Sequence, residues 1–506
     1  MLGPTLNRDM AGHSLSRRRF LGRTALGTAG ICTSFTPASK WLAAQTADPV
    51  LLPSYIADAN GNGLLGAQDE IVVRRALFSK RGFGRRPETG FDYRADIFGR
   101  ATVEENALES VRYTVSEIGS LTTPTRRPIT VAWHYGWYNR LDRPPGTQTV
   151  KFKWGDYVSW DRGIETLFND QKNEFGISVD ALSWIPPRAN AHLLDNYKKG
   201  YLEASNLGTR HVALLYESTL ALPTLNGRID FLDPAVSGLA KNDFDQLASF
   251  MVRLRDLTPA KVFTLNDRPV VFIFGTHAWG RFPIARSEFI AMESVIDQCR
   301  EAFYEVYGQF PYLVGEEMLL SSKGIIASDR IRRTRSFDAI YVYHHASNLK
   351  PTRLSGVDAT LFVTPRYMEN QLAVLRKTYA AVSNLRNRHT SQRILVIPNL
   401  APGFAKPGLP TLKIDRPGYA DFMKLIQQFH EREYISTQWQ TLLGTGTLPA
   451  PVYIVGSWNE EFEGHAVFPS SLNESLSTTV QDGFDLPMAI KEAFGWNHYA
   501  KRKISI

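Results

Sequence analysis

The stretch PVYIVGSWNEEFEG, residues 451–464, gives the first indication of the fold. It begins with four apolar, β-favouring residues, Val452 to Val455, and then runs into Glu460, Glu461 and Glu463. A strand that ends at a solvated surface would also carry glutamates, but Trp and Phe are interleaved with these ones. Two carboxylates in a Glu-x-x-Glu spacing can face one substrate. Glycosidic-bond cleavage needs such a pair, one as proton donor and one as base or nucleophile.

Seven similar apolar runs precede this one, at residues 128–138, 176–185, 210–218, 268–276, 311–317, 337–345 and 393–404. Several are nearly continuous in apolar residues, which is typical of parallel strands covered by helices on both sides. Helical patterns lie between runs, for example at 244–257, 287–308 and 367–386. Residues 121–506 therefore predict a (β/α)8 TIM barrel. An open, doubly wound α/β sheet would alternate in the same way and is the alternative fold.

Polar and aromatic residues recur at the C-terminal ends of the predicted strands. In a parallel barrel these ends meet at one face, where active sites lie. Any one such residue is more often structural than functional, so the recurrence is the evidence. The candidate substrate-binding residues are Tyr135, Trp137, Tyr138, Trp184, Glu217, His277, Tyr343, Trp458 and Asn459. The sequence leaves open whether Glu316, Glu317 and Glu461 join them.

The N-terminus has the pattern of an export signal. Residues 16–21 read SRRRFL, close to the twin-arginine motif, and a mildly apolar run follows as far as about Phe35. Ala43 and Ala44 offer a cleavage site. We therefore predict a signal peptide at residues 1–44 and a periplasmic or extracellular location. The apolar run is too short and too weakly apolar for a stable membrane span.

Most of the excess positive charge of the chain lies in this signal. The formal net charge is +8, of which residues 1–44 contribute six Lys or Arg and one Asp, so about +3 is left for the remainder. No nucleic-acid partner is expected on this basis. Of the two cysteines, Cys32 lies in the signal and Cys299 is then alone, so no intramolecular disulfide is expected.

Residues 45–120 are predicted to form a small helical N-terminal segment that contains a calcium-type loop at 58–69. The loop has oxygen-bearing side chains at positions one, three, five and twelve, and a glycine at the sharp turn. It resembles the loops of EF-hand and dockerin-type modules. The predicted ligands are Asp58, Asn60, Asn62, the carbonyl of Leu64, and Asp69. Neutral Asn ligands and Asp in place of the usual Glu predict weak, structural calcium binding; an Asn-Gly turn without metal is the alternative.

Four stretches in chain order resemble the endo-α-mannosidase family of glycoside hydrolases, family 99. WHYGWY (133–138) is similar to the family's opening His-Tyr-Tyr-Pro-Trp-Tyr segment. HVALLYES (211–218) is similar to its third strand, which ends in Glu, and IPNLAPGF (397–404) to its Pro-rich seventh strand end. SWNEEFEG (457–464) resembles its catalytic Asn-Glu-x-x-Glu-Gly signature. The resemblance spans roughly residues 126–470 and excludes the signal and the calcium-type loop.

The resemblance implies that Glu460 is a base and Glu463 an acid in a retaining hydrolysis in which the substrate's own 2-hydroxyl attacks the anomeric carbon. The chain differs from the family at Glu461 and Phe462, where Trp-His is usual, and at Gly136, where Pro is usual. The leading prediction is an exported glycoside hydrolase that cleaves an α-linked, mannan-like glycan without a catalytic cofactor. The alternatives are a non-catalytic glycan-binding barrel and a calcium-dependent surface or assembly module, the latter supported only by the loop at 58–69.

Overall fold

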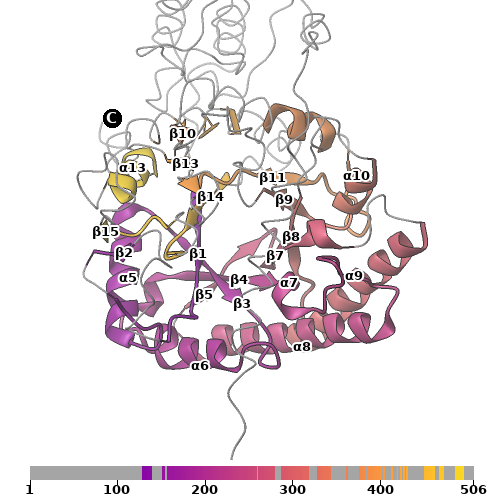
Figure 1. Cartoon of the computed structure of the whole chain (residues 1–506), viewed down its shortest axis with the longest axis horizontal. Coiled ribbons are helices and arrows are strands. Elements are labelled where there is room, and N and C mark those ends of the chain that lie inside the picture. The colour runs from indigo at the N-terminus through magenta and orange to yellow at the C-terminus, as the bar shows by residue number, and fades with distance from the viewer. Residues whose placement is uncertain are drawn as a thin grey trace, which may run out of the picture.

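Figure 1 shows the computed structural model of the chain. It describes residues 128–139, 151–153, 156–258, 260–279, 286–317, 328–342, 361–362, 375–382, 385–401, 403–404, 412–413, 419, 422–423, 426–427, 429–430, 450–461, 466–471 and 485–494. The predicted signal, the N-terminal segment with its calcium-type loop, and the site residues Tyr343 and Glu463 lie outside these ranges. Those predictions are not tested by the structure.

In the described part of the chain, eight parallel strands form the main path of the central sheet, and two short strands pair at its side. The eight are β1 (Ile129–His134), β3 (Val179–Trp184), β4 (His211–Glu217), β7 (Arg268–Phe274), β8 (Tyr312–Glu316), β9 (Ala339–Tyr341), β11 (Leu395–Ile397) and β14 (Val452–Ser457). Neighbours pair in the order β11-β9-β8-β7-β4-β3-β1-β14. Each strand falls in one of the eight apolar runs of the sequence.

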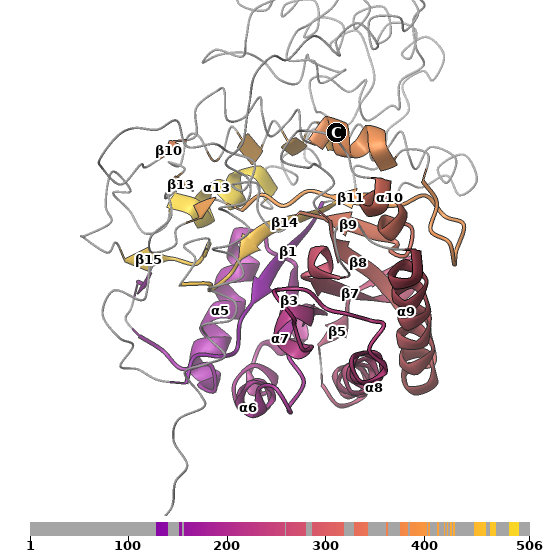
Figure 2. The ribbon, with the colours of Figure 1, turned by 45° about the vertical axis from the view of Figure 1, so that its right-hand side comes forward.

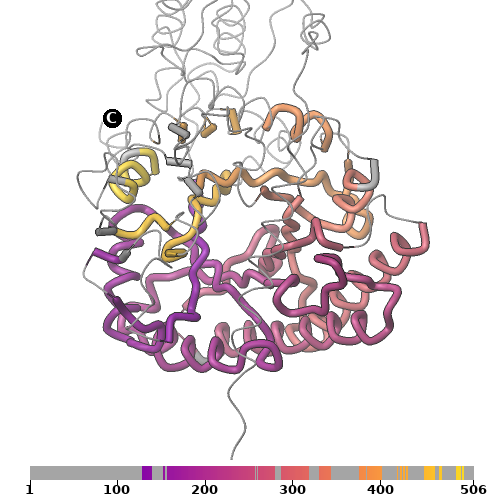
Figure 3. The backbone as a smooth tube through the Cα atoms, in the orientation of Figure 1, coloured from indigo at the N-terminus to yellow at the C-terminus, as the bar shows by residue number. Residues whose placement is uncertain are grey.

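The sheet closes on itself next to β11. The Ile454 amide donates to the Pro398 carbonyl at 2.9 Å, and the Leu400 amide donates to the Ile454 carbonyl at 2.6 Å. These bonds join the segment that follows β11 to β14, and the tube in Figure 3 can be followed round the ring. The prediction of a (β/α)8 barrel is confirmed, and the open sheet is wrong.

Helices cover the outside of the ring (Figures 1 and 2). The longer ones are α5 (Arg162–Phe175), α6 (Ala191–Lys199), α8 (Pro234–Leu257), α9 (Arg286–Tyr307), α10 (Ser328–Thr334) and α13 (Asp485–Phe494). The shorter elements are β2 (Lys151–Phe152), η3 (Tyr201–Glu203), η4 (Leu207–Thr209), α7 (Ser218–Ala221), β5 (Lys261–Val262), β6 (Thr264–Leu265), η5 (Thr276–Ala278), β10 (Leu361–Phe362), β12 (Gly403–Phe404), β13 (Leu412–Lys413) and β15 (Ser470–Ser471). Of the predicted helices, 244–257 lies within α8 and 287–308 matches α9, while residues 375–382 of the third are helical. None of the described helices has the length and apolar character needed to cross a membrane.

Aromatic side chains fill the inside of the barrel. The Trp133 ring lies 5.0 Å from that of Phe272 and 5.2 Å from that of Tyr341, and all three residues are buried. They come from β1, β7 and β9, so the packing spans the ring. Because strand side chains alternate, the residue after Trp133 faces the opposite side, toward the helices. The interior is thus a packed core, and chemistry is restricted to the strand ends.

Candidate functional site at the C-terminal ends of the strands

A β-bulge at the end of β14 sets the direction of the acidic stretch. Val131 pairs with Ile454, but Trp133 pairs with Ser457, so β14 has one residue more than β1 in this interval. Gly456 has a φ of 93°, a left-handed conformation that glycine adopts without steric cost. Bulges bend a strand and re-aim the residues that follow. This bulge turns Trp458, Asn459 and Glu460 toward the end of β1.

Asn459 bonds the turn at residues 457–461, called here the acidic turn because it carries Glu460 and Glu461, to the end of β1. Its Oδ1 accepts the Tyr135 amide at 2.8 Å, and its Nδ2 donates to the Tyr135 carbonyl at 2.8 Å and to the Tyr157 hydroxyl at 3.0 Å. The side chain thus pairs with Tyr135 as a neighbouring strand would. Asn459 is fully buried. The structure therefore gives this predicted substrate-binding residue a positioning contact with the protein.

Tyr138 holds the peptide groups on both sides of Glu460. Its hydroxyl donates to the Asn459 carbonyl at 2.5 Å and accepts the Glu461 amide at 3.2 Å. The Glu460 amide donates to the Ser457 hydroxyl at 3.1 Å. Glu460 and Glu461 are each 1% exposed, so both side chains are buried.

Tyr135, Gly136 and Trp137 form the rest of the β1 end. The rings of Tyr135 and Trp137 lie 4.3 Å apart at 31°. A Cβ atom on Gly136 would lie 2.5 Å from Cε1 of Tyr197, which is too close. The Tyr197 ring is itself held, because its hydroxyl proton is shared between the carbonyl oxygens of His134 at 3.0 Å and Ser183 at 2.8 Å. Close packing therefore explains the glycine at a position where the family that the sequence resembles has proline.

Two of the three tryptophans predicted to bind substrate, Trp184 and Trp458, are covered by protein, whereas Trp137 is partly exposed. Trp184 is 2% exposed and its ring lies 6.0 Å from that of Tyr216, whose hydroxyl bonds to Asp243 on α8 at 2.7 Å. Trp458 is fully buried, with the Phe168 ring of α5 at 5.8 Å. Both indoles pack between strands and helices.

Carboxylates also stand at the ends of β4 and β8. Glu217 accepts the Ser183 hydroxyl at 2.8 Å and is fully buried. Oε2 of Glu316 accepts the Gly275 amide at 2.7 Å and lies 3.2 Å from Nδ1 of His277. The site residues therefore fall into three groups: the β1–β14 cluster, the Ser183–Glu217 pair and the His277–Glu316 pair.

Glu317 has a structural partner. Arg333 donates to it through Nε at 2.5 Å and through a terminal nitrogen at 2.8 Å, and both side chains are buried. Such a two-pronged ion pair uses both carboxylate oxygens. Glu317 thus anchors α10 to the end of β8.

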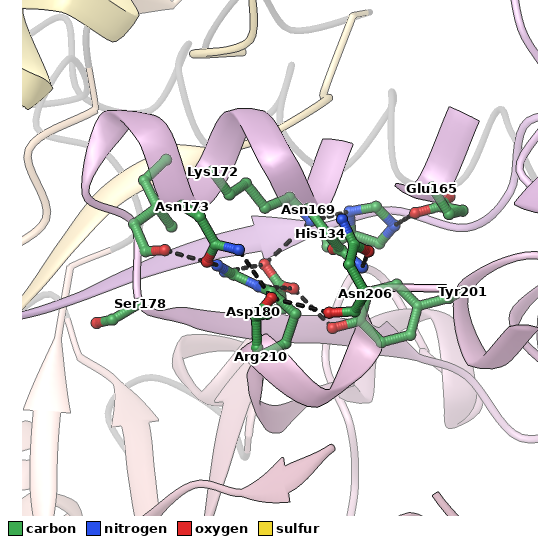
Figure 4. Close-up of polar contacts among 12 residues, drawn as sticks. His134, Glu165, Asn169, Lys172, Asn173, Ser178, Asp180, Tyr201, Asn206 and Arg210 are labelled. Carbon is green, nitrogen blue, oxygen red and sulfur yellow. Dashed lines mark hydrogen bonds and ion pairs between the residues drawn. The ribbon is translucent and has the colours of Figure 1, made fainter. Parts of the chain in front are cut away.

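A buried chain of charges supports the end of β1 from behind (Figure 4). Nζ of Lys172 lies 3.2 Å from Nδ1 of His134 and 3.1 Å from Oδ1 of Asp180. Nε2 of His134 lies 3.2 Å from Glu165, and Arg210 donates twice to Asp180, each time at 3.0 Å. His134 therefore faces α5, away from the inside of the barrel.

Burial and pairing compete in this chain of charges. Burial lowers the pKa of the Lys172 ammonium, and Asp180 opposes the change only in part. Burial raises the pKa of the Asp180 carboxyl, but Arg210 and Lys172 outweigh it and hold that pKa well below its usual range. Asp180 is thus a fixed anion that ties α5 and the start of β4 to β3. Sequence analysis missed these residues, although a lone Asp in an apolar strand requires a buried partner.

No group of three or more His, Cys, Asp or Glu that could hold a metal ion occurs in the part of the chain that the structure describes. The residues of the predicted calcium loop lie outside that part.

No protein-family model matches the sequence, and no curated protein matches it significantly. The similar solved structures include the GH99 endo-α-mannosidase from Bacteroides thetaiotaomicron in complex with bis-tris propane (16% identity, 75% of this chain, 99% of that chain, TM-score 0.45). They also include a glycoside hydrolase-like protein (15% identity, 73% and 94%, TM-score 0.48) and endo-glycoceramidase II from a Rhodococcus species (10% identity, 72% and 78%, TM-score 0.35). At these identities and TM-scores the similarity assigns no family, and the strand pairing alone establishes the barrel.

Proposed function

We propose that this protein is a glycoside hydrolase that cleaves an α-linked, mannan-like glycan with Glu460 and Glu463. The observation that carries the proposal is the fixed acidic turn at the end of β14. Asn459 and Tyr138 bond this turn to the end of β1, at the face of the barrel where strand ends meet. Catalytic carboxylates need such rigid support, since a small misplacement costs much of the rate.

In the proposed reaction, Glu460 takes the proton of the substrate 2-hydroxyl as that oxygen attacks the anomeric carbon. Glu463 protonates the departing glycosidic oxygen, which leaves as an alcohol. Glu463 then takes a proton from water, which opens the resulting 1,2-anhydro sugar at the anomeric carbon, and Glu460 returns its proton to the 2-oxygen. Two inversions at one carbon retain the anomeric configuration. These roles follow the resemblance of residues 457–464 to the family signature.

The test is product release from a panel of α-mannans, α-glucans and bacterial exopolysaccharides, with products identified by mass spectrometry. Wild type is compared with Glu460→Gln, Glu463→Gln and, as a matched control, Glu301→Gln on the exposed outer side of α9. We expect oligosaccharides from wild type and the control, and a loss of at least about a hundredfold in the other two. Undiminished hydrolysis by Glu463→Gln would contradict the proposed roles.

A non-catalytic glycan-binding barrel is the second candidate. It is favoured by the near-complete burial of Glu460 and Glu461, and by Glu461 and Phe462 in place of the family's Trp-His. This function predicts binding to a polysaccharide of the same panel without product, and binding that Glu460→Gln leaves unchanged.

Two parts of the proposal depend on the N-terminal sequence alone. The SRRRFL motif supports export through the twin-arginine pathway to the periplasm or beyond. The spacing of residues 58–69 supports weak structural calcium binding. Calorimetry on the calcium-free mature protein should give a heat of calcium binding and a raised melting temperature; the absence of both would exclude this site.

A further inference from the structure

Trp160 differs from the other tryptophans of the described part of the chain. It is 50% exposed, whereas Trp137 is partly buried and Trp133, Trp184, Trp279 and Trp458 are at most 3% exposed. Its indole makes no ring contact with another described residue. Burial of a tryptophan normally contributes strongly to folding stability, and the exposed half of the Trp160 side chain makes no such contribution.

The backbone on both sides of Trp160 is fixed. Before it, the Ser159 amide donates to the Tyr138 carbonyl at 2.8 Å, and the Ser159 hydroxyl accepts the Tyr138 amide at 3.2 Å. After it, Asp161 caps α5 by accepting the Gly163 amide at 2.8 Å. Trp160 is therefore held as a rigid platform.

Close packing behind this segment fixes it further. A Cβ atom on Gly200 would lie 2.2 Å from the Ser159 carbonyl oxygen and 3.0 Å from Cα of Trp160. Only glycine permits this approach of the two backbones. The backbone of Ser159 and Trp160 is therefore packed directly against Gly200.

Trp160 lies at the mouth of the barrel. Helix α5 leads into β3, so it runs from the mouth to the base, and Trp160 comes just before its N-terminus. Ser159 is bonded to Tyr138, and the Tyr138 hydroxyl bonds to the Asn459 carbonyl and the Glu461 amide. One residue, Tyr138, thus links the exposed tryptophan to the acidic turn.

We propose that Trp160 is the stacking platform of an outer sugar subsite, which binds one ring of a polysaccharide chain that extends from the acidic turn past the start of α5. The apolar C–H face of a pyranose ring matches the flat indole, and stacking removes both surfaces from water. The inference depends on the proposed function and deepens it. It makes the substrate a glycan that extends beyond the part held at the acidic turn, because the platform lies at the start of α5, outside that turn.

The test is affinity electrophoresis of the mature protein in gels that contain yeast α-mannan, dextran or a bacterial exopolysaccharide, with a trisaccharide of the same sugar as competitor. The variants are Trp160→Ala, Trp160→Phe and the control Phe310→Ala. Phe310 is 39% exposed and precedes β8, so it lies at the opposite end of the barrel. Thermal melts check that each variant is folded. We expect all of them to fold, because both side chains are exposed.

In Trp160→Ala we expect the affinity for the polymer to fall about tenfold relative to the affinity for the trisaccharide, as the loss of one stacked ring face implies. Trp160→Phe should keep most of the affinity and Phe310→Ala all of it. If wild type binds a polymer and Trp160→Ala binds it equally well, the subsite is excluded while the proposed function stands. If wild type neither binds nor cleaves any polymer of the panel, the proposed function and the subsite fail together.

Discussion

The hydrogen bonds by which Asn459 holds the acidic turn can be tested by measuring the thermal stability of an Asn459 variant. Asn459→Ala removes three hydrogen bonds: the Tyr135 amide to Oδ1, and Nδ2 to the Tyr135 carbonyl and to the Tyr157 hydroxyl, at 2.8, 2.8 and 3.0 Å. A buried polar group that loses its partner costs about 1–3 kcal/mol. The Tyr157 hydroxyl can rotate toward another partner, so we expect a total loss of about 3–5 kcal/mol. For a barrel of this size the melting temperature should fall by roughly 4–8 °C.

The assay is thermal denaturation followed by circular dichroism, with Asn242→Ala on the exposed side of α8 as the control. The control should stay within about 0.5 kcal/mol of wild type. Asn459→Asp is the informative companion, because it keeps Oδ1 as an acceptor but places a carboxylate oxygen against the Tyr135 carbonyl. It should be at least as destabilised as Asn459→Ala. A melting temperature of Asn459→Ala within a degree of wild type would refute the view that these bonds hold the turn.

Two further predictions concern pH and packing. Burial raises the pKa of the Asp243 carboxyl to about 6, and Arg188 at 2.8 Å opposes this only in part. Since this folded-state pKa exceeds that of the unfolded chain, the stabilisation is complete below about pH 4 and is lost as the pH rises through about 6, by roughly 3 kcal/mol. Asp243→Asn should therefore flatten the melting temperature between about pH 4 and pH 7; an unchanged slope would contradict the assignment. Gly136→Ala should destabilise by about 1–3 kcal/mol in denaturant melts, because its Cβ would lie 2.5 Å from Tyr197. Gly238→Ala on α8, with nothing within 4 Å, should stabilise by about 0.5–1 kcal/mol, and the opposite order would show that side-chain space at these glycines does not decide stability.

The strands of the barrel were predictable because each is a short, almost continuous apolar run. Even β9 and β11, with three residues each, lie in such runs. The direction of the side chains was not predictable, since both faces of a barrel strand are buried and carry the same residue types. Trp184 was therefore predicted to bind substrate, although it packs beside Tyr216.

Contacts between distant residues were also beyond the sequence. Gly456 did not by itself predict the bulge, because a glycine in a strand indicates either a bulge or a close contact with other atoms. Asp180 signalled a buried charge, but its partner Arg210 lies 30 residues further along the chain. The acid pair itself could be predicted only as a local motif, and Glu463 lies outside the described residues.

The long separation between the acidic turn and its supports has a consequence for folding. Asn459 bonds to Tyr135 across 324 positions of the chain, and Tyr138 reaches Asn459 across 321. These bonds join the first strand of the barrel to the last, so they form only when the ring closes. The closing of so long a loop is entropically costly and must be offset by the pairing of β14 with β1 and with the segment after β11. The turn that carries Glu460 and Glu461 and the closure of the barrel are therefore one structural event, and a chain that has not closed its barrel has not formed this turn.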